Sequence, residues 1–451
     1  MTRFRQLAIL LTTSLALSGC ALFQVGTQQA KLSARCEIGG TVAVQLADKK
    51  AGNTRAPLIV ALYRHVDGTP LERENWQVYD FSVLSRTNQW GFSAVAGDYA
   101  VVAVQDLNSN LSYDAGEPAY VPNAEQSVHC AGRGEEIVQN VVINGIPDVG
   151  EASVDFFSMR IGEDQQQLGQ TFAAAPLTAG QITTLDDPNF SRTMATMGLW
   201  RPYDFIQRAR MGIYFLQDYD PKKIPVLFVH GLSGTPTDFR NLIGNLDTKR
   251  FQPWVVFYPS GIPLGLLSRR LAELMHEVHL RYGFPEAMVV SHSMGTLVSR
   301  AMLMHLHAIS DDFVPLFITV AGPWDGVASA ALGVRDAPTP VWSWIDIAPR
   351  SDFLDSLFYR DDEAHTRVRL PPGVRHYLLF SYLPNQGGDG TIALTSQLRV
   401  EAQDDATALV GVEGSHVGVL SDPRTLTVVH KLLDDAATAS AAHPERVAQQ
   451  R

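Results

Sequence analysis

The sequence predicts an α/β fold: a domain built on a parallel sheet, preceded by a smaller all-β sandwich domain. Two patterns carry this prediction. In the second half of the chain, short and nearly continuous apolar runs alternate with segments of helical apolar spacing, as expected for strands buried on both faces. In the first third, short runs rich in β-branched and aromatic residues follow one another between turns. A length of 451 residues leaves room for two or three domains.

Residues 1–19 are predicted to be a signal peptide. Two arginines give a positive start, and the apolar stretch 7–17 is too short to span a bilayer. The sequence Leu-Ser-Gly-Cys that ends at Cys20 resembles the lipobox of bacterial lipoproteins. The resemblance implies that the Cys20 thiol is lipidated and, with Ala21 after it, that the protein is anchored to the outer membrane of a Gram-negative cell. An ordinary cleaved signal with a free Cys20 is the alternative.

A tether and the all-β domain are expected next. Residues 20–35 are rich in Gln, Ala and Ser, which suits a short tether between lipid and domain. Residues 36–146 are predicted to form the β-sandwich, and the segment 91–103 resembles transthyretin-like domains. The expected strands are 41–46, 58–64, 77–83, 90–95, 99–106 and 137–143. Cys36 and Cys130 are expected to form a disulfide in an oxidising compartment, with two buried thiols as the alternative.

The remainder is divided into a connector over 147–220, the α/β domain over 221–433 and a flexible tail over 434–451. Apolar residues at helical spacing predict helices over 267–278 and 295–308. The buried strands are expected over 226–229, 254–258, 287–290, 316–321, 376–382 and 408–412.

The pentapeptide Ser291-His292-Ser293-Met294-Gly295 connects an expected strand directly to an expected helix. This is the context of a nucleophile elbow, in which a sharp turn lifts a serine hydroxyl above the sheet edge. Small flanking residues are needed because neighbouring backbone passes close. Ser291 stands where glycine is usual, and it is nearly as small. We therefore predict that Ser293 is a catalytic nucleophile.

The turn His230-Gly231-Leu232-Ser233-Gly234 follows the first buried strand. Together with the elbow, it resembles the lipases and esterases of the α/β-hydrolase superfamily, over about residues 213–433. The resemblance implies that the backbone amides of Leu232 and Met294 form an oxyanion hole. Met294 also begins a helix, whose positive end favours a developing oxyanion. A surface turn without a catalytic role is the alternative.

In this superfamily the acid and the base follow the nucleophile along the chain. Asp389 lies in a glycine-rich turn after the fifth buried strand, and His416 lies in a Gly-Ser-His-Val-Gly turn after the sixth. The predicted triad is therefore Ser293, Asp389 and His416, with the imidazole as base and the carboxylate fixing its tautomer. Asp325 is the alternative acid. His292 is expected to point away from the Ser293 hydroxyl.

An insertion at about 324–370 is rich in large apolar groups, four of which are Trp342, Trp344, Phe353 and Phe358. Two interpretations stay open. The segment is either a lid or cap that forms an acyl pocket over Ser293, or additional helices that pack in the ordinary way.

A polar loop in the all-β domain has oxygen-bearing side chains at the spacing of a twelve-residue calcium loop. These residues are Asp106, Asn108, Asn110, Asp114 and Glu117. Leu111 stands where an EF-hand has glycine, and no flanking helices are expected, so the loop is not an EF-hand. A calcium-binding turn and a solvated polar loop both remain open.

The charge balance of 36 basic and 47 acidic residues argues against a nucleic-acid partner. The combined features predict a membrane-tethered serine hydrolase that cleaves carboxylic esters, chiefly lipid or other hydrophobic acyl esters, through an acyl-enzyme. No cofactor is required for this chemistry. The alternatives are an acyltransferase that uses the same triad and a non-catalytic envelope lipoprotein that binds a partner.

Overall fold

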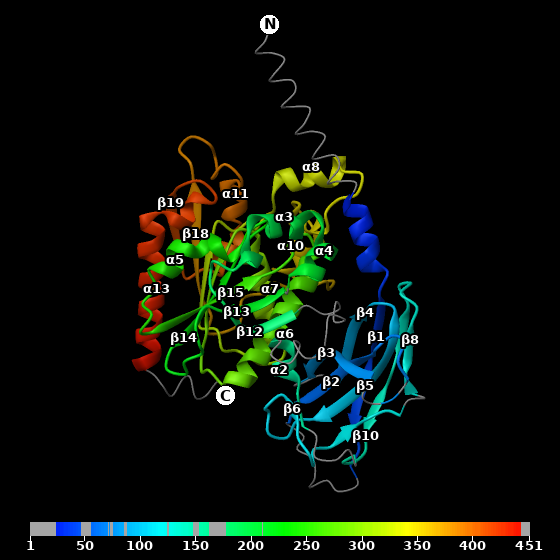
Figure 1. Ribbon diagram of the computed structural model, residues 1–451. Helices are drawn as coiled ribbons and strands as arrows, with labels where there is room; N and C mark the ends of the chain where they lie inside the picture. The colour runs from blue at the N-terminus through cyan, green and yellow to red at the C-terminus, as the bar shows by residue number, and fades with distance from the viewer. Residues whose placement is uncertain are drawn as a thin grey trace.

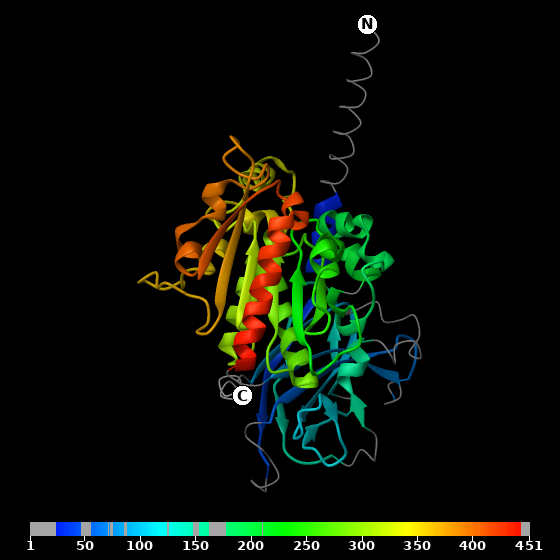
Figure 2. The same ribbon diagram turned by 90° about the vertical axis from the view of Figure 1, so that its left-hand side faces the viewer.

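The fold is described from a computed structural model of the chain (Figures 1 and 2). The residues that the structure describes are 24–46, 56–70, 72, 75–84, 88–123, 126–147, 153–161, 177–209 and 211–442. The predicted signal peptide and Cys20 lie outside the described residues. Within these ranges, no helix is both long and apolar enough to cross a membrane.

The first part of the chain is all-β, as predicted, and its two sheets pack on one shared core. The four-stranded sheet contains β1 (Cys36–Val44), β4 (Gln89–Ala94), β9 (Glu136–Val138) and β10 (Val141–Ile143). The five-stranded sheet contains β2 (Leu58–His65), β3 (Trp76–Leu84), β5 (Gly97–Gln105), β7 (Ala119–Tyr120) and β8 (Val128–Cys130). A further pair joins β6 (Ser112–Tyr113) to β11 (Val154–Asp155). The strand predicted over 137–143 is two strands, and between them the side chain of Asn140 replaces a backbone partner, its Oδ1 accepting the Thr41 amide at 3.0 Å.

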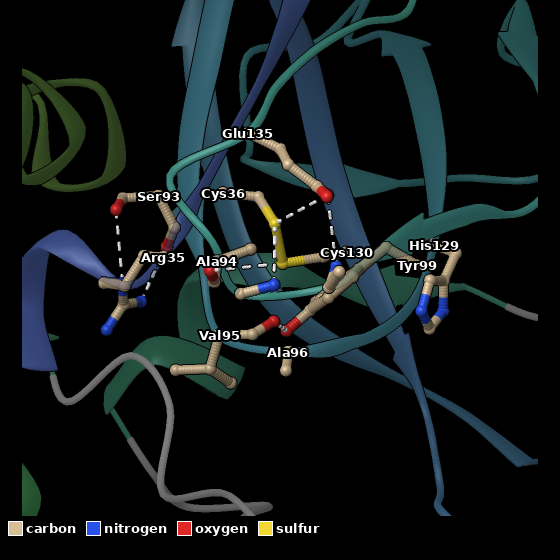
Figure 3. The surroundings of a disulfide bond; sticks show 12 residues. Arg35, Cys36, Ser93, Ala94, Val95, Ala96, Tyr99, His129, Cys130 and Glu135 are labelled. Atoms are coloured by element: carbon tan, nitrogen blue, oxygen red, sulfur yellow. Dashed lines mark hydrogen bonds between the residues drawn. A yellow bond between two sulfur atoms is a disulfide. The ribbon is translucent and has the colours of Figure 1, made fainter.

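The predicted disulfide between Cys36 and Cys130 is present, with the two Cα atoms 5.9 Å apart. Cys36 begins β1 and Cys130 ends β8, so the bond joins the two sheets. Figure 3 shows the ring of Tyr99 beside it, and the Tyr99 hydroxyl donates to the Val95 carbonyl at 2.8 Å. The disulfide is therefore part of the core that holds the sandwich together.

The tether predicted over 20–35 is wrong for its described part, because residues 24–33 form a helix that packs against the protein. Val25 and Gln28 are buried, and Leu32 is partly buried on the same side. Their spacing is that of one helix face. The polar composition suggested a flexible chain, but the small number of apolar residues falls on a single face.

The second part is built on an eight-stranded sheet in the order β12-β13-β15-β14-β16-β17-β18-β19. Its strands are β12 (Leu177–Ile182), β13 (Met211–Phe215), β14 (Ile224–Val229), β15 (Phe251–Phe257), β16 (Met288–His292), β17 (Leu316–Val320), β18 (Arg375–Tyr382) and β19 (Ala408–Glu413). The six predicted strands are all present and form the parallel part of the sheet. β13 runs antiparallel to β15. The sheet begins at Leu177, so the connector predicted over 147–220 already contributes two strands.

Helices cover both faces of this sheet. One face is covered by α6 (Leu264–Tyr282) and α7 (Met294–Ala308), and the other by α5 (Arg240–Gly244) and α13 (Pro423–Ala442). The remaining helices are α2 (Phe156–Ile161), α3 (Arg192–Trp200), α4 (Pro202–Arg208), α8 (Ala328–Asp336), α9 (Trp342–Ile347), α10 (Asp352–Ser356), α11 (Leu394–Gln397) and α12 (Val400–Asp404). The flexible tail predicted from residue 434 is wrong as far as residue 442, because Ala436 and Ala437 are buried within α13.

The two parts of the molecule are joined through α6. Arg270 on this helix pairs with the buried carboxylate of Asp80 on β3, with Nη2 and Oδ2 2.5 Å apart. Arg281, near the end of the helix, donates to the Asn110 carbonyl at 2.6 Å and to Asp155 Oδ2 at 2.9 Å. Apolar residues from both parts share one core cluster. The all-β part is therefore fixed to the face of the sheet that α6 and α7 cover, and it lies at the end of the molecule opposite α8 (Figure 1).

Candidate active site

Ser293 occupies a sharp turn between β16 and α7. Its backbone has φ 55° and ψ −133°, a conformation that non-glycine residues rarely adopt outside functional turns. Neighbouring backbone passes very close, as predicted for an elbow. A Cβ on Gly295 would lie 2.4 Å from the His230 carbonyl oxygen, and one on Gly231 would lie 2.6 Å from the Ser293 Cβ. Ser291 is fully buried, which explains why a small residue is needed there.

The structure brings the three predicted triad residues together. His416, in the turn after β19, places its Nε2 2.8 Å from Ser293 Oγ. Its Nδ1 lies 2.8 Å from Asp389 Oδ2, in the turn after β18. The His416 amide also donates to the Asp389 carbonyl at 3.0 Å, which fixes the two turns to each other. Both side-chain contacts have the length that proton transfer through hydrogen bonds requires.

Asp389 is buried and receives several hydrogen bonds besides that from the imidazole. Its Oδ2 accepts from the Ser381 hydroxyl at 2.7 Å and from Gln397 Nε2 at 3.2 Å, while its Oδ1 accepts the Ile392 amide at 2.7 Å. Burial by itself would raise the pKa of Asp389, but the hydrogen bonds from His416, Ile392 and Ser381 outweigh it and hold this pKa below its ordinary value. The carboxylate therefore stays ionised and accepts the Nδ1–H of His416.

Ser381 and Gln397 were not predicted. Each is a common polar residue, one at the end of β18 and the other in the short α11, and neither belongs to a motif. Only the folded chain brings both side chains to the Asp389 carboxylate. A single sequence contains no signal that would have identified them.

His292 supports the base from its other side. Burial, with a smaller contribution from the nearby His416 ring, lowers the pKa of His292 to about 3. The ring is therefore neutral, and its Nε2 lies 2.8 Å from the His416 carbonyl oxygen, to which it donates. This contact is with the backbone of the base, not with the Ser293 hydroxyl. The expectation that His292 points away from the nucleophile is consistent with this geometry.

The two backbone amides proposed as oxyanion donors belong to Leu232, after β14, and Met294, after β16. Met294 is the first residue of α7, so its amide has no acceptor within the helix. Among the described residues, neither this amide nor that of Leu232 has a hydrogen-bond acceptor. Both donors are thus unused in the structure, which fits an oxyanion hole. Their role toward a bound substrate stays a prediction.

The turn that carries Leu232 is fixed by buried side chains. Burial lowers the pKa of His230 to about 4, so its ring is neutral and Nδ1 donates to the Gly231 carbonyl at 2.9 Å. The Tyr258 hydroxyl donates to the His230 carbonyl, and the two rings stack with centroids 4.0 Å apart. Farther along, Ser233 donates its amide to the Ser260 hydroxyl at 2.9 Å. The Leu232 amide therefore has a rigid support.

The alternative acid, Asp325, is not part of this arrangement. Its side chain is exposed, and its amide hydrogen bonds with Ser396. The carboxylate partner of the imidazole is Asp389. The structure thus favours the first of the two candidate acids.

The insertion predicted at 324–370 divides into two portions. The later portion is ordinary packing: Leu354 and Phe358 are buried in the main core, and Arg300 of α7 donates to the Leu357 carbonyl at 2.8 Å. The earlier portion contains α8 and α9, which lie at the same end of the molecule as the site (Figure 1). Ser293 is 8% exposed and His416 is 9% exposed, so both residues are nearly covered. Only α8 and α9 remain candidates for a cap.

The predicted calcium loop is closed by its own hydrogen bonds. Asp106 is fully buried, and burial raises its pKa. Glu117 Oε1 accepts a backbone amide of the same loop at 2.7 Å. The side-chain amides of Asn108 and Asn110 both donate to Asp114 Oδ2 at 2.8 Å. Within the described part of the chain, no group of three or more His, Cys, Asp or Glu residues is placed to hold a metal ion. Calcium binding here stays a prediction.

The sequence profile of the lecithin:cholesterol acyltransferase family matches residues 267–334, which run from α6 through the elbow to α8. Among curated proteins, no relative matches. Solved structures are similar over about half of the chain. Mature lipase BlEst2 of Bacillus licheniformis is 18% identical with a TM-score of 0.38, covering 48% of this chain and 94% of that chain. Lipase B of Aspergillus fumigatus is 17% identical with a TM-score of 0.37, covering 48% and 54%. An esterase from Thermogutta terrifontis is 18% identical with a TM-score of 0.33, covering 50% and 88%.

The strand order, the parallel core of the sheet and the strand-turn-helix elbow define the architecture of the second part. It has the α/β-hydrolase fold, as predicted, and the all-β part precedes it. The fold sets the nucleophile turn and the two supporting turns at the carboxyl ends of β16, β18 and β19.

Proposed function

We propose that this chain is a serine hydrolase that cleaves carboxylic esters through an acyl-enzyme. One observation supports the proposal most directly: Ser293 Oγ, the His416 ring and the Asp389 carboxylate form a continuous hydrogen-bonded series with both contacts at 2.8 Å. A structural serine and histidine would not need a buried, ionised carboxylate behind them. The arrangement therefore argues against a non-catalytic lipoprotein.

The proposed reaction follows from this series. His416 Nε2 takes the proton of Ser293 Oγ as that oxygen bonds to the ester carbonyl carbon. The amides of Leu232 and Met294 stabilise the negative charge on the carbonyl oxygen. The bond to the leaving alcohol then breaks, and the imidazolium returns its proton to the alkoxide. A water deprotonated by His416 releases the acyl group as a carboxylic acid and restores Ser293.

We propose lipid or other hydrophobic acyl esters as substrates and a lipid on Cys20 as the membrane anchor. Helices α8 and α9, at the same end of the molecule as the site, support the first idea, since they carry Leu332 and Ile345 with exposed side chains. The lipobox-like sequence supports the second, with the outer membrane as the expected location. The reaction requires no cofactor, because the nucleophile, base and oxyanion donors all belong to the chain.

Acyl transfer is the second candidate, and the match of residues 267–334 to the lecithin:cholesterol acyltransferase family favours it. In this case an alcohol, instead of water, attacks the same acyl-enzyme. Product analysis in the presence of added alcohols or lysolipid separates the two reactions. Transfer gives a new ester, whereas hydrolysis gives only the free acid.

A fluorophosphonate probe tests the proposal, because it labels only an activated serine. We expect labelling of the wild-type protein and its loss in Ser293→Ala. Ser291→Ala is the matched control, because it removes a hydroxyl two residues away that has no hydrogen-bond partner in the described structure. Labelling that persists in folded Ser293→Ala, or no labelling of the wild-type protein, would refute the proposal.

A further inference from the structure

Helix 24–33 is held against the helices that surround the active site. Val25 is buried in a small cluster with Leu199 of α3 and Val341, which precedes α9. The side chains of Leu232 and Trp344 pack on the same cluster. The helix is therefore one layer of side chains away from the residue that carries a proposed oxyanion donor.

Two polar contacts reinforce this docking. Gln29 Nε2 donates to the Pro340 carbonyl at 2.9 Å, on the loop between α8 and α9. Gln28 is buried, and its Oε1 accepts the Asp204 amide of α4 at 3.1 Å. The helix thus touches α3, α4 and the cap loop together, and its position relative to the cap is fixed.

The predicted lipid lies only a short length of chain from this docked helix. Cys20 precedes Gln24, the first residue that the structure describes, by four positions, and Gln24 already lies in the helix. Even a fully extended chain covers at most about 3.5 Å per residue, so the Cα atom of Cys20 lies within about 14 Å of that of Gln24. A helix docked on the cap consequently limits the distance between the cap and the membrane.

The cap also presents apolar side chains to solvent. Leu332 on α8 and Leu266 on α6 are each 52% exposed, and Ile345 on α9 is 42% exposed. These three helices adjoin one another. A Cβ on Gly333 of α8 would touch the Trp344 ring of α9, and Asp346 of α9 accepts the backbone amide at the start of α6 at 2.6 Å.

We propose that the face formed by helix 24–33, α8, α9 and the start of α6 lies on a phospholipid bilayer, and that the docked helix sets this orientation. The inference rests on the proposed function for the lipid on Cys20 and for the ester substrate. The bilayer is the occupant because the Cα atom of Cys20 lies within about 14 Å of that of Gln24 and because exposed apolar groups on this face would enter the interface. The net charge of −11 argues against attraction by anionic lipids as the main force.

This orientation provides a route for a lipid ester to the nearly covered Ser293. The site lies at the end of the molecule that carries α8 and the N-terminal helix (Figure 1). An ester could then leave the bilayer and reach Ser293 without crossing water with its acyl chain exposed. The all-β part, at the other end, would point away from the membrane.

Orientation is tested directly with the full-length lipidated protein on vesicles of phosphatidylethanolamine and phosphatidylglycerol. An environment-sensitive fluorophore is placed on Leu332→Cys or, as the matched control, on Val138→Cys in the all-β part, where the side chain is 75% exposed. We expect a blue shift and protection from an aqueous quencher at position 332 only. Equal protection at both positions, or none at 332, would overturn the proposal.

The role of the helix is tested with Val25→Asp, which should undock it, against Val138→Asp, an exposed position in the all-β part outside the proposed face. The measured quantity is the rate on a long-chain ester in the vesicle divided by the rate on a soluble short-chain ester. We expect this ratio to fall about tenfold for Val25→Asp, because a tethered protein without a fixed orientation seldom presents its site to the bilayer. For Val138→Asp the ratio should change less than about twofold. Equal ratios would overturn the proposal. If neither ester is cleaved, the proposed function fails, while the fluorophore still reports the orientation.

Discussion

The triad edge of the α/β part and the polar loop of the all-β part both gather oxygen-bearing side chains, but they are organised in opposite ways. At the triad edge, partners come from distant segments: His416 and Ser293 are 123 positions apart, and His416 and Asp389 are 27 apart. In the polar loop, Glu117 and Asp114 bind groups within the loop itself. The comparison shows that side chains that meet from distant segments distinguish a reactive site from a well-formed turn. A high content of polar residues does not distinguish the two.

The largest expected effect compares one carboxylate from each region. Asp389→Asn should lower kcat on a soluble ester by about 10⁴-fold, because an amide in this position holds the imidazole in the wrong tautomer. Asp114→Asn, the matched change in the polar loop, should alter kcat by less than about twofold, since surface changes away from the site rarely matter. Steady-state kinetics of both folded variants decides the matter. Similar losses in the two variants would break the comparison.

The next prediction removes a covalent constraint from the all-β part only. The disulfide closes a loop of 94 residues, so Cys36→Ala with Cys130→Ala should destabilise this part by about 4 to 5 kcal/mol in the chain-entropy model. The triad edge has its own hydrogen bonds and should keep its kcat. Urea unfolding measures the first effect, and ester hydrolysis at low temperature measures the second. A collapse of kcat in the folded double variant would mean that the sandwich supports the site.

Much of this organisation could be predicted because particular residues carry local signals. Val226 to Val229 and Leu316 to Val320 are continuous apolar runs, and strands buried on both faces must be so. Ser293, Asp389 and His416 each follow such a run within a turn of small residues. The carboxyl ends of parallel strands lie at the same edge of a sheet. The three turns that follow these strands could therefore be expected to meet.

The rest depends on tertiary contacts that leave no pattern in one sequence. β12 is short and contains Gly and polar residues, and it forms a strand because β13 provides its partners. Helix 24–33 has few apolar residues, and it is stabilised by docking on Val341 and Leu199. Ser381 and Gln397 acquire their role only where the chain brings them to Asp389. Such contacts override the propensity of the segment in which each residue lies.

A third prediction concerns acid stability at the α/β sheet. Burial lowers the pKa of His376 and of His292 to about 3 each, whereas an unfolded histidine has a pKa of about 6.5. Between these values the unfolded chain binds more protons, so the stability is complete above about pH 6.5 and is lost as the pH falls toward 3. At pH 5 each histidine should cost about 2 kcal/mol. His376→Gln should flatten the dependence of the unfolding free energy on pH by about one proton. The unfolding free energy is measured by urea titration at several pH values from about 4.5 to 7. If its dependence on pH is the same in His376→Gln as in the wild-type protein, the prediction is wrong.

The smallest expected effect returns to the polar loop and asks whether a cation can reorganise it. To bind calcium, Glu117 must give up the backbone amides that it accepts at 2.7 and 3.0 Å, and Asp114 must release two side-chain amides. Because calcium must displace these hydrogen bonds, we expect it to bind weakly, with a dissociation constant of about 1 mM, as in extracellular modules. At about 10 mM calcium the native state would then gain about 1.4 kcal/mol. Thermal unfolding with calcium, against magnesium and against Asp114→Asn, measures this gain. No shift with calcium would show that local hydrogen bonds satisfy the loop completely. The contrast with the triad edge would then be sharper, because Asp389 accepts the amides of Thr391 and Ile392 in its own turn and still binds the distant His416 ring.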